Sequence, residues 1–283
     1  MKNWLITGVS RGIGKALAEA ALARGDTVIG TIREVDPGIG WPMGPPGSRN
    51  GTLHCLRLEM QDPAAIEATA ARAFDLAGRL DVVVNNAGYG LLSPVEEASD
   101  VEMARLFEVN VYGPIRLIRA VLPRLRTQSS GHIINITSIA GRAPMAGSGI
   151  YAATKAAMEG LSHSLAQEVG PLGIKVTAVA PGAFRTDFLS DHSIRKCTWS
   201  DDYASSAGKV IEYLNGMDGK QLGDPARAAQ SILALVDSDT PPVHLLLGSD
   251  ALRRAREQLD AVIEGIDRWE DVTRSTDFKS EAA

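Results

Sequence analysis

Residues 3–31 read NWLITGVSRGIGKALAEAALARGDTVIGT, and this stretch decides the fold. Asn3–Thr7 is a short apolar run typical of a buried strand, and Thr27–Thr31 is a second such run. Between them, alanine and leucine recur with helical spacing from Gly12 until Gly25, which is well placed to end a helix. A strand, a glycine loop, a helix and a strand within about 30 residues make a βαβ unit. The sequence therefore predicts a parallel sheet from its first residues.

The loop of this unit contains three glycines, Gly8, Gly12 and Gly14. Gly8 permits a tight turn, and the other two let a pyrophosphate approach the helix N-terminus and its free N–H groups. The spacing is Gly-x3-Gly-x-Gly rather than the common GxGxxG fingerprint. A glycine cluster can also be a simple strand-to-helix turn, but its place after the first strand favours a phosphate site.

The rest of the chain alternates further apolar runs with helical patterns. The expected strands are Thr52–Glu59, Leu80–Gly88, His132–Ser138, Ile174–Gly182 and Val243–Gly248. The expected helices are 64–77, 101–125, 149–165, 225–236 and 250–269. This alternation predicts an α/β fold with one seven-stranded parallel sheet that is covered by helices on both faces. We expect a single dinucleotide-binding and catalytic domain over 1–283, with a proline- and glycine-rich loop at 36–51, a lid at 183–223, and a C-terminal helix and loose polar tail at 250–283.

Composition excludes several classes of protein. The chain has 283 residues, of which 45% are hydrophobic and 22% charged, and its net charge of −5 gives no reason to expect a nucleic-acid or anionic-membrane partner. Its two cysteines, Cys55 and Cys197, are too few for a disulfide framework and have no metal-ligand spacing, so we expect no metal. Cys55 falls in an apolar strand pattern and is interpreted as a core residue. With no signal peptide and no apolar run of about 18 residues, the sequence suggests a cytoplasmic protein without a membrane span.

Candidate chemistry converges on Ser138, Tyr151 and Lys155. If Ser148 caps a helix, Tyr151 and Lys155 lie on one face, about one turn apart. A phenol has a pKa of about 10, and a nearby ammonium lowers it towards the range useful for proton transfer. Ser138 closes the run HIINITS and can reach the same reacting oxygen. Such a site moves a proton on a carbonyl or alcohol oxygen, and a hydride source is then needed to reduce a ketone.

Six motifs in order make the sequence resemble a short-chain dehydrogenase/reductase over about residues 3–250. They are TGVSRGIG (7–14), NNAG (85–88), VNVYG around Asn110, ITSIAG around Ser138, YAATK (151–155) and PGAFRT (181–186). The resemblance implies a Rossmann-like sheet with strand order 3-2-1-4-5-6-7, and usually a homodimer or homotetramer. It implies that Tyr151 is the general acid or base, that Lys155 binds the nicotinamide ribose and lowers the pKa of Tyr151, and that Ser138 binds the substrate oxygen. It also implies that Asn110 holds a water that passes protons to Lys155.

The same resemblance implies a set of cofactor-binding residues. They are Gly8, Ser10, Arg11, Gly12, Ile13, Gly14, Arg33, Glu59, Met60, Asn86, Ala87, Gly88, Tyr151, Lys155, Pro181, Gly182, Phe184 and Thr186.

The choice between NADP and NAD depends on the residues after the second strand. A carboxylate there accepts hydrogen bonds from the ribose of NAD, whereas an arginine attracts the 2′-phosphate of NADP. Ile32 occupies the family's acidic position, followed by Arg33, and Arg11 is a second cation. We therefore expect NADPH, with NAD as the alternative if Glu34 is the sugar-binding acid. Glu59-Met60 departs from the family pattern of Asp followed by a small apolar residue.

The substrate is less well specified. Apolar side chains gather in the lid and in two other loops: Leu91, Leu92, Met145, Phe184, Phe188, Leu189, Trp199, Tyr203 and Tyr213. They suit a mid-sized apolar ketone or secondary alcohol, or they pack inside the lid or at a subunit interface. Arg185, Arg195 and Lys196 leave a phosphate-bearing substrate open.

We therefore expect an NADP(H)-dependent carbonyl reductase or alcohol dehydrogenase, which interconverts a ketone and a secondary alcohol. The alternatives are an NAD-dependent secondary alcohol dehydrogenase and a nucleotide-sensing binding protein without turnover.

Overall fold

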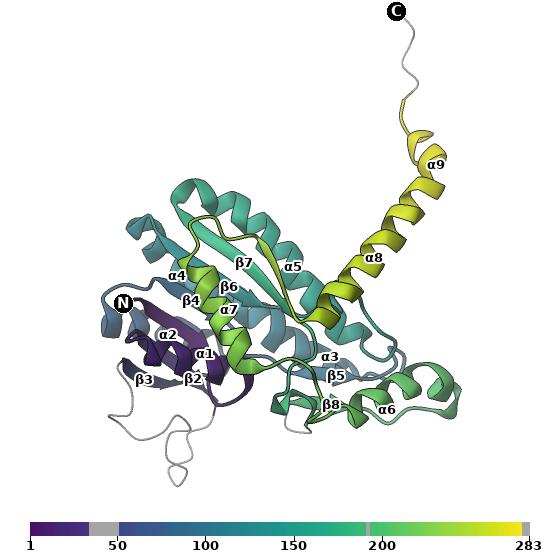
Figure 1. Ribbon diagram of the computed structural model, residues 1–283, viewed down its shortest axis with the longest axis horizontal. Coiled ribbons are helices and arrows are strands. Elements are labelled where there is room, and N and C mark those ends of the chain that lie inside the picture. The colour runs from purple at the N-terminus through teal and green to yellow at the C-terminus, as the bar shows by residue number, and fades with distance from the viewer. Residues whose placement is uncertain (34–50, 191–192, 279–283) are drawn as a thin grey trace, which may run out of the picture.

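The computed structural model describes residues 1–33, 51–190 and 193–278. Seven parallel strands form one sheet in the order β3-β2-β1-β4-β6-β7-β9 (Figure 1). They are β1 (Asn3–Thr7), β2 (Thr27–Ile32), β3 (Thr52–Arg57), β4 (Val82–Asn85), β6 (Gly131–Ile136), β7 (Ile174–Pro181) and β9 (His244–Leu247). The predicted order 3-2-1-4-5-6-7 is confirmed, since the labels differ only because β5 (Gly90–Leu92) and β8 (Ile194–Lys196) pair in a separate two-stranded sheet.

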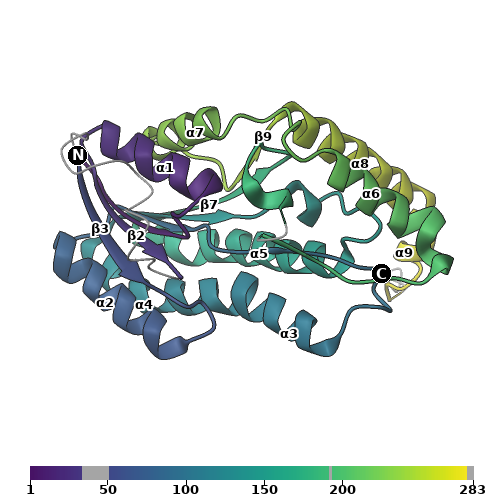
Figure 2. The ribbon, with the colours of Figure 1, turned by 90° about the horizontal axis from the view of Figure 1, so that it is seen from below.

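Helices cover both faces of the large sheet (Figure 2). One face carries α1 (Gly12–Ala23) and α7 (Pro225–Asp237), which pack against each other. The other carries α2 (Pro63–Ala77), α4 (Gly113–Gln128) and α5 (Gly149–Val169), with α3 (Asp100–Phe107) leading into α4. The remaining helices are α6 (Lys209–Gly216), α8 (Ser249–Arg268) and α9 (Glu270–Arg274). Among the described residues, no helix has the length and apolar character that crossing a membrane would require.

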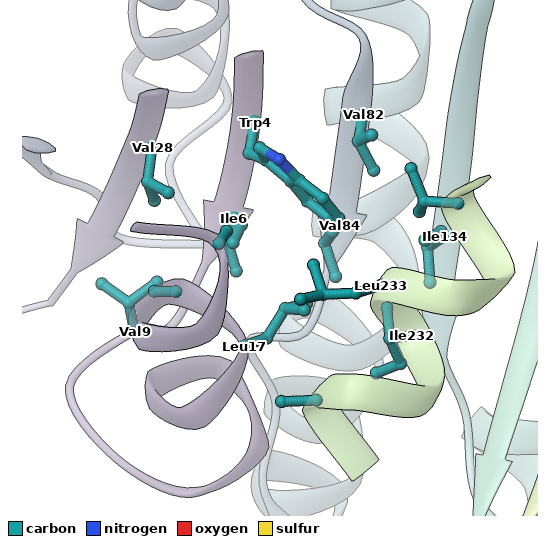
Figure 3. Close-up of a cluster of buried hydrophobic side chains, with 14 of the residues drawn as sticks. Trp4, Ile6, Val9, Leu17, Val28, Val82, Val84, Ile134, Ile232 and Leu233 are labelled. Atoms are coloured by element: carbon teal, nitrogen blue, oxygen red, sulfur yellow. The ribbon is translucent and has the colours of Figure 1, made fainter. Parts of the chain in front are cut away.

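The first βαβ unit forms because its apolar side chains have a buried face on each element. Trp4 and Ile6 of β1 and Leu17 of α1 are fully buried against Ile232 and Leu233 of α7 (Figure 3). Gly25 has φ +93° directly after the helix, a conformation that glycine adopts without strain. Strand β1 lies inside the sheet, between β2 and β4, and the loop that follows it opens at the carboxyl edge, where open α/β sheets bind ligands.

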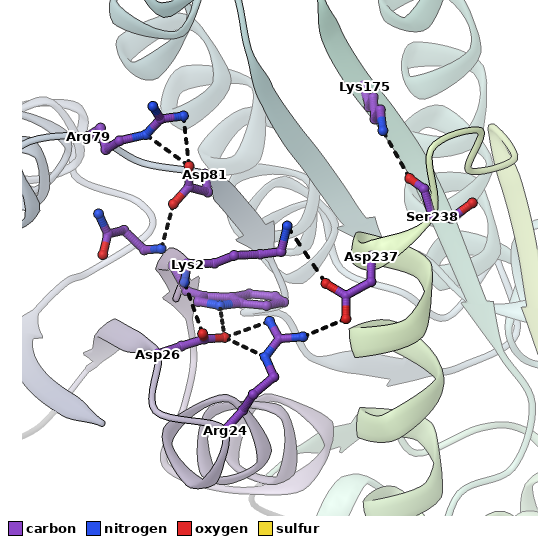
Figure 4. Close-up of polar contacts among 10 residues, drawn as sticks. Lys2, Arg24, Asp26, Arg79, Asp81, Lys175, Asp237 and Ser238 are labelled. Atoms are coloured by element: carbon purple, nitrogen blue, oxygen red, sulfur yellow. Dashed lines mark hydrogen bonds and ion pairs between the residues drawn. The ribbon is translucent and has the colours of Figure 1, made fainter. Parts of the chain in front are cut away.

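A buried carboxylate anchors the opposite, amino-terminal edge of β1 (Figure 4). Asp26 is 1% exposed and accepts hydrogen bonds from the backbone N–H of Lys2 (2.9 Å), from Nε1 of Trp4 (2.9 Å) and from the guanidinium of Arg24. Burial alone would raise the pKa of Asp26, but the hydrogen bonds from Arg24, Lys2 and Trp4 outweigh it and hold the pKa below its usual value. Arg24 also pairs with Asp237 and so ties this edge to α7.

The structure corrects several details of the predicted elements. The single helix expected over 101–125 is α3 and α4 joined by a π-helical turn at Glu108–Tyr112. Cys55 is exposed on edge strand β3 rather than buried in the core. The tail expected to be loose after Asp271 begins with α9. The loop expected at 36–51 lies outside the described residues, apart from Gly51.

Candidate active site

The glycine loop after β1 is bound to the turn after β4. Asn86 donates through Nδ2 to the carbonyls of Thr7 and Gly8, both at 2.9 Å, and its own N–H and that of Ala87 donate to Oγ1 of Thr7 at 3.0 Å. A Cβ on Gly14 would lie 2.3 Å from the Gly8 carbonyl and from Asn86 Nδ2, so only glycine fits there. The predicted residues Gly8, Gly14, Asn86 and Ala87 therefore form one tight unit.

The glycine turn lies close to the loop after β7. Gly12 has φ +61°, and a Cβ on it would meet only Thr186, at 3.7 Å. Gly12 also starts α1, whose first N–H groups face this space. A helix N-terminus beside a glycine turn suits a pyrophosphate. The predicted residues Ser10, Arg11 and Ile13 belong to the same turn, and Ile13 is partly buried against the core.

The π-helical turn places Asn110 in the site. Asn110 is 2% exposed; its Nδ2 donates to the Tyr89 carbonyl (2.9 Å) and to Oγ1 of Thr154 (3.3 Å), and its Oδ1 accepts from the Tyr89 N–H (3.1 Å). The side chain thereby holds the chain just after the NNAG turn and contacts α5. A Cβ on Gly88 would lie 2.9 Å from Asn110 Oδ1 and 3.7 Å from Lys155 Nζ, so these groups adjoin the same small space.

Ser138, Tyr151 and Lys155 are brought together as the sequence predicts. The Tyr151 hydroxyl is hydrogen-bonded to Ser138, whose Oγ also accepts the Ala140 N–H at 3.1 Å. Lys155 Nζ donates to the Ile136 carbonyl at the end of β6 (2.9 Å) and lies 5.8 Å from the centre of the Tyr151 ring. Tyr151 and Lys155 are 9% and 7% exposed.

Ser148 differs from its expected role in this arrangement. It occupies the N-cap position of α5, but its hydroxyl donates to the Met145 carbonyl at 2.7 Å and does not cap the helix.

The protonation equilibria of the pair are set mainly by burial. Burial raises the pKa of Tyr151 to about 12, an effect that the hydrogen bond with Ser138 opposes. Burial lowers the pKa of Lys155 to about 8, opposed by the charge of Glu159. The predicted lowering of the Tyr151 pKa by Lys155 is therefore not seen, because the ammonium is directed at the Ile136 carbonyl. Burial therefore shifts both equilibria towards the neutral forms, although Lys155 still carries its proton at pH 7.

Glu159, one turn beyond Lys155, was not singled out from the sequence. It is 8% exposed; it accepts a short hydrogen bond from Thr137 and pairs with Arg142 at 2.7 Å and with Nδ1 of His244 at 2.9 Å. Thr137 lies between Ile136 and Ser138, so this bond holds the segment that carries both site groups. Its spacing of eight residues from Tyr151 puts Glu159 on the same face of α5, and this was the available signal in the sequence. Its partners Arg142 and His244 come from distant segments, so the ion pairs could not be predicted.

The residues predicted to bind the adenosine end of the cofactor differ in burial and in contacts. Met60 is 4% exposed and packs against the start of α4, where a Cβ on Gly113 would lie 2.9 Å from its methyl carbon. Glu59 accepts the N–H of Gln61 at 3.4 Å. Arg33 directly follows β2, as the sequence predicts, and its side chain is exposed. Glu34, the alternative sugar-binding acid, lies outside the described residues.

The loop after β7 is held by Asp250, which the sequence motifs did not identify. Asp250, in the first turn of α8, accepts the Ala183 N–H through Oδ2 at 2.8 Å, and a Cβ on Gly182 would lie 2.2 Å from its carboxylate. Phe184, predicted to contact the cofactor, packs its ring against Gly223. Pro181 ends β7, and Thr186 faces the glycine turn.

The lid residues divide into packing and site-facing groups. Leu92, Leu189 and Trp199 form a cluster with Ile194 and Ile211, and therefore stabilise the lid itself. Phe188 packs in that cluster and also lies 5.9 Å from the Tyr151 ring, between ring centres. Leu91, with Phe188, belongs to the cluster that contains Tyr151. Tyr213 is largely exposed.

Comparison with known proteins assigns the chain to a family. The sequence matches the short-chain dehydrogenase family over residues 2–196. The chain belongs to this family and is an NAD(P)-dependent oxidoreductase.

Individual relatives cover nearly the whole chain. Oxidoreductase BOA17 of Botryotinia fuckeliana is 34% identical over 280 residues, 96% of this chain and 98% of that protein. The 3-ketodihydrosphingosine reductase of Bacteroides thetaiotaomicron is 34% identical over 86% of this chain and 87% of its own length. The crystal structure of a short-chain dehydrogenase from Streptomyces avermitilis has a TM-score of 0.89 and 40% identity, and the match covers 98% of this chain and 100% of that one. A short-chain dehydrogenase from Sphingobium yanoikuyae in complex with NADPH has a TM-score of 0.71 and 26% identity over 100% of this chain and 99% of that one.

Proposed function

We propose that the protein is an NADP(H)-dependent carbonyl reductase that converts a mid-sized, mainly apolar ketone into a secondary alcohol. The observation that carries this proposal is the buried Tyr151 hydroxyl, hydrogen-bonded to Ser138 beside Lys155 and next to the glycine turn. Family membership supplies the reaction class, and the site supplies the groups for proton transfer to a carbonyl oxygen.

The proton chemistry favours reduction. With a pKa of about 12, Tyr151 is protonated at neutral pH and can donate its proton to a developing alkoxide. Ser138 is placed to donate a hydrogen bond to the same oxygen, which orients the carbonyl and stabilises the charge that forms there. The nicotinamide cofactor supplies the hydride when bound. Asn110 and Lys155 adjoin the space next to Gly88 and would hold the water and the ribose hydroxyls through which Tyr151 is reprotonated.

The residues present fit a dinucleotide. The glycine turn at the start of α1, beside Thr186, would accept the pyrophosphate, and the NNAG turn would border the adenosine ribose. Arg11 and Arg33 favour NADP over NAD because a guanidinium pairs with a phosphate. Among the proteins similar in structure, two were solved with NADPH bound.

Phe188 and Leu91 line the approach to Tyr151 with apolar surface and favour a hydrophobic substrate. One relative is named a 3-ketodihydrosphingosine reductase. A long-chain or otherwise apolar ketone is therefore the first substrate class to test.

Two experiments test the proposal. Titration with NADPH and NADH, followed by energy transfer from tryptophan, should show tighter binding of NADPH; Arg11→Ala with Arg33→Ala should abolish that preference. Equal loss for both cofactors would contradict the assignment of the 2′-phosphate. Preference of the wild type for NADH would point to the NAD-dependent alcohol dehydrogenase, and the screen would then move to secondary alcohols.

The second experiment isolates the general acid. Tyr151→Phe should bind NADPH like the wild type but reduce apolar ketones about 100-fold more slowly or worse, since general acid catalysis contributes ~10²–10⁴. Tyr89→Phe is the matched control, because Tyr89 packs in the same cluster and its buried hydroxyl has no hydrogen-bond partner among the described residues. Turnover of Tyr151→Phe equal to that of the control would rule out the mechanism.

A further inference from the structure

Helix α8 begins at the carboxyl edge of the sheet, next to the loop after β7 (Figure 1). Strand β9 pairs with β7 as far as Leu247, which lies opposite Pro181, and α8 starts two residues later at Ser249. Of the 20 residues of α8, only Ala251 and Ala255 are buried. The base of the helix is therefore the part that packs against the body of the protein.

This base is fixed to the segment that follows Ser138. The two buried alanines pack with Ile139 and Ala143 in one cluster, and Arg254 donates a hydrogen bond to the Ala143 carbonyl. Burial lowers the pKa of Arg254, and the charge of Asp250, one turn earlier on the helix, opposes this shift. Asp250 thus stands on a base that is tied to the segment carrying the substrate-oxygen ligand.

The carboxylate of Asp250 occupies the place that a side chain on Gly182 would take. A Cβ on Gly182 would lie 2.2 and 2.4 Å from the two carboxylate oxygens. The same carboxylate accepts the Ala183 N–H through Oδ2 at 2.8 Å. A hydrogen bond to an ionised acceptor is stronger than one to a neutral acceptor. One acidic side chain therefore fixes two consecutive residues where the chain leaves β7.

The hydrogen bonds of this loop leave one N–H for a ligand. Within 182–186, four of the five backbone N–H groups donate to the protein itself: those of Gly182, Ala183, Arg185 and Thr186. The fifth, the N–H of Phe184, has no hydrogen-bond partner in the described part of the chain. Backbone N–H groups that are shielded from water are almost always paired. Because the N–H groups on either side of it are bound, the direction of the Phe184 N–H is fixed.

We propose that Asp250 is a positioning residue for the nicotinamide: it holds Gly182 and Ala183 so that the Phe184 N–H is ready for an acceptor on that part of the cofactor. The inference rests on the proposed function, in which the loop after β7 contacts the cofactor. Since the base of α8 also packs on the segment after Ser138, one helix holds the hydride-donor side and the substrate-oxygen side of the site in a fixed relation. Such fixed orientation is what a transfer between two bound molecules requires.

A purely structural role for Asp250 makes a different prediction. An acidic residue in the first turn of a helix stabilises that helix through its dipole. Loss of that effect would lower the stability of the protein and weaken every ligand alike. Positioning of the nicotinamide loop predicts a loss that is confined to ligands containing the nicotinamide.

Calorimetric titration with NADPH and with 2′,5′-ADP, which has no nicotinamide, separates the two roles. Asp250→Ala should bind NADPH about tenfold more weakly, the effect of one hydrogen bond to a charged group, and should bind 2′,5′-ADP like the wild type. Asp250→Asn keeps an oxygen for the Ala183 N–H and should recover most of the affinity for NADPH. Asp260→Ala, which changes an exposed acid on the same helix, is the matched control and should bind both ligands normally. NADH and ADP replace the two ligands if the wild type prefers NADH.

The fluorescence of bound NADPH gives a second readout, because the emission comes from the nicotinamide itself. At saturation, the emission in Asp250→Ala should be closer to that of free NADPH than it is in the wild type. Unchanged affinity for NADPH in Asp250→Ala, or equal weakening of NADPH and 2′,5′-ADP, overturns this inference alone. A wild-type protein that binds no nicotinamide nucleotide would contradict the proposed function, and this inference with it.

Discussion

Replacing Lys155 with methionine should make the protein more stable and inactive. Folding lowers the pKa of Lys155 from 10.5 to about 8, a difference of about 2.5 units, which corresponds to about 3 kcal/mol at neutral pH. Methionine removes this penalty and has nearly the same length, so it leaves little cavity. The substitution also loses the hydrogen bond to the Ile136 carbonyl, worth about 1 kcal/mol. The expected net gain at pH 7 is about 2 kcal/mol.

The stability gained by Lys155→Met should decrease as the pH rises. Between about pH 8 and pH 10.5 the unfolded chain binds the Lys155 proton more tightly than the folded chain, so the wild type becomes more stable as the pH rises through this window. The variant has no such proton. Its advantage should therefore be largest below pH 8 and about 1 kcal/mol smaller at pH 9 than at pH 7.

Urea unfolding, followed by tryptophan fluorescence at one protein concentration, measures the stability gain at pH 7 and its change with pH. With a slope of about 3 kcal/mol per molar, the variant's midpoint at pH 7 should lie roughly 0.7 M higher. Lys175→Met is the control, because the partly buried Lys175 also donates to a backbone carbonyl, that of Ser238, at 2.9 Å. A Lys155→Met protein that is less stable than the wild type at pH 7, or whose advantage does not change with pH, refutes the reasoning.

Three further substitutions test other parts of the structure. Asp26→Ala leaves buried donors without an acceptor and should lower the free energy of unfolding, measured in urea at pH 7, by about 3 kcal/mol. Because the pKa of Asp26 is lowered in the folded state, its carboxylate stabilises the protein only above about pH 4, so the loss should shrink as the pH falls below 4. Gly14→Ala should weaken NADPH binding at least tenfold by fluorescence titration, while Gly160→Ala, with open space around its Cβ, should bind normally; equal binding by both would contradict the tight glycine turn. Glu159→Gln removes the charge that raises the pKa of Lys155, so the basic limb of the pH–rate profile should move to lower pH; an unmoved limb would show that Lys155 does not titrate with activity.

Much of the fold follows from local patterns. Strands such as Asn3–Thr7 and Ile174–Pro181 are buried on both sides, so their apolar runs are continuous and their limits are visible in the sequence. The helix at Pro225–Asp237 begins where Asp224 and proline predict it, since Asp224 Oδ1 accepts the Ala226 N–H at 2.8 Å. The motifs also identified the groups that meet in the site, because Tyr151 and Lys155 share one helix face.

Contacts between distant segments determined the rest. The sequence alone identified the sheet, its strand order by family resemblance, and the candidate site residues. Only the tertiary structure decided that Lys155 points at the Ile136 carbonyl, that Glu159 is held by Thr137, Arg142 and His244, and that most of α8 is exposed. Local patterns specify backbone conformation and burial, but the direction of a charged side chain and its pKa depend on which distant groups the fold brings beside it.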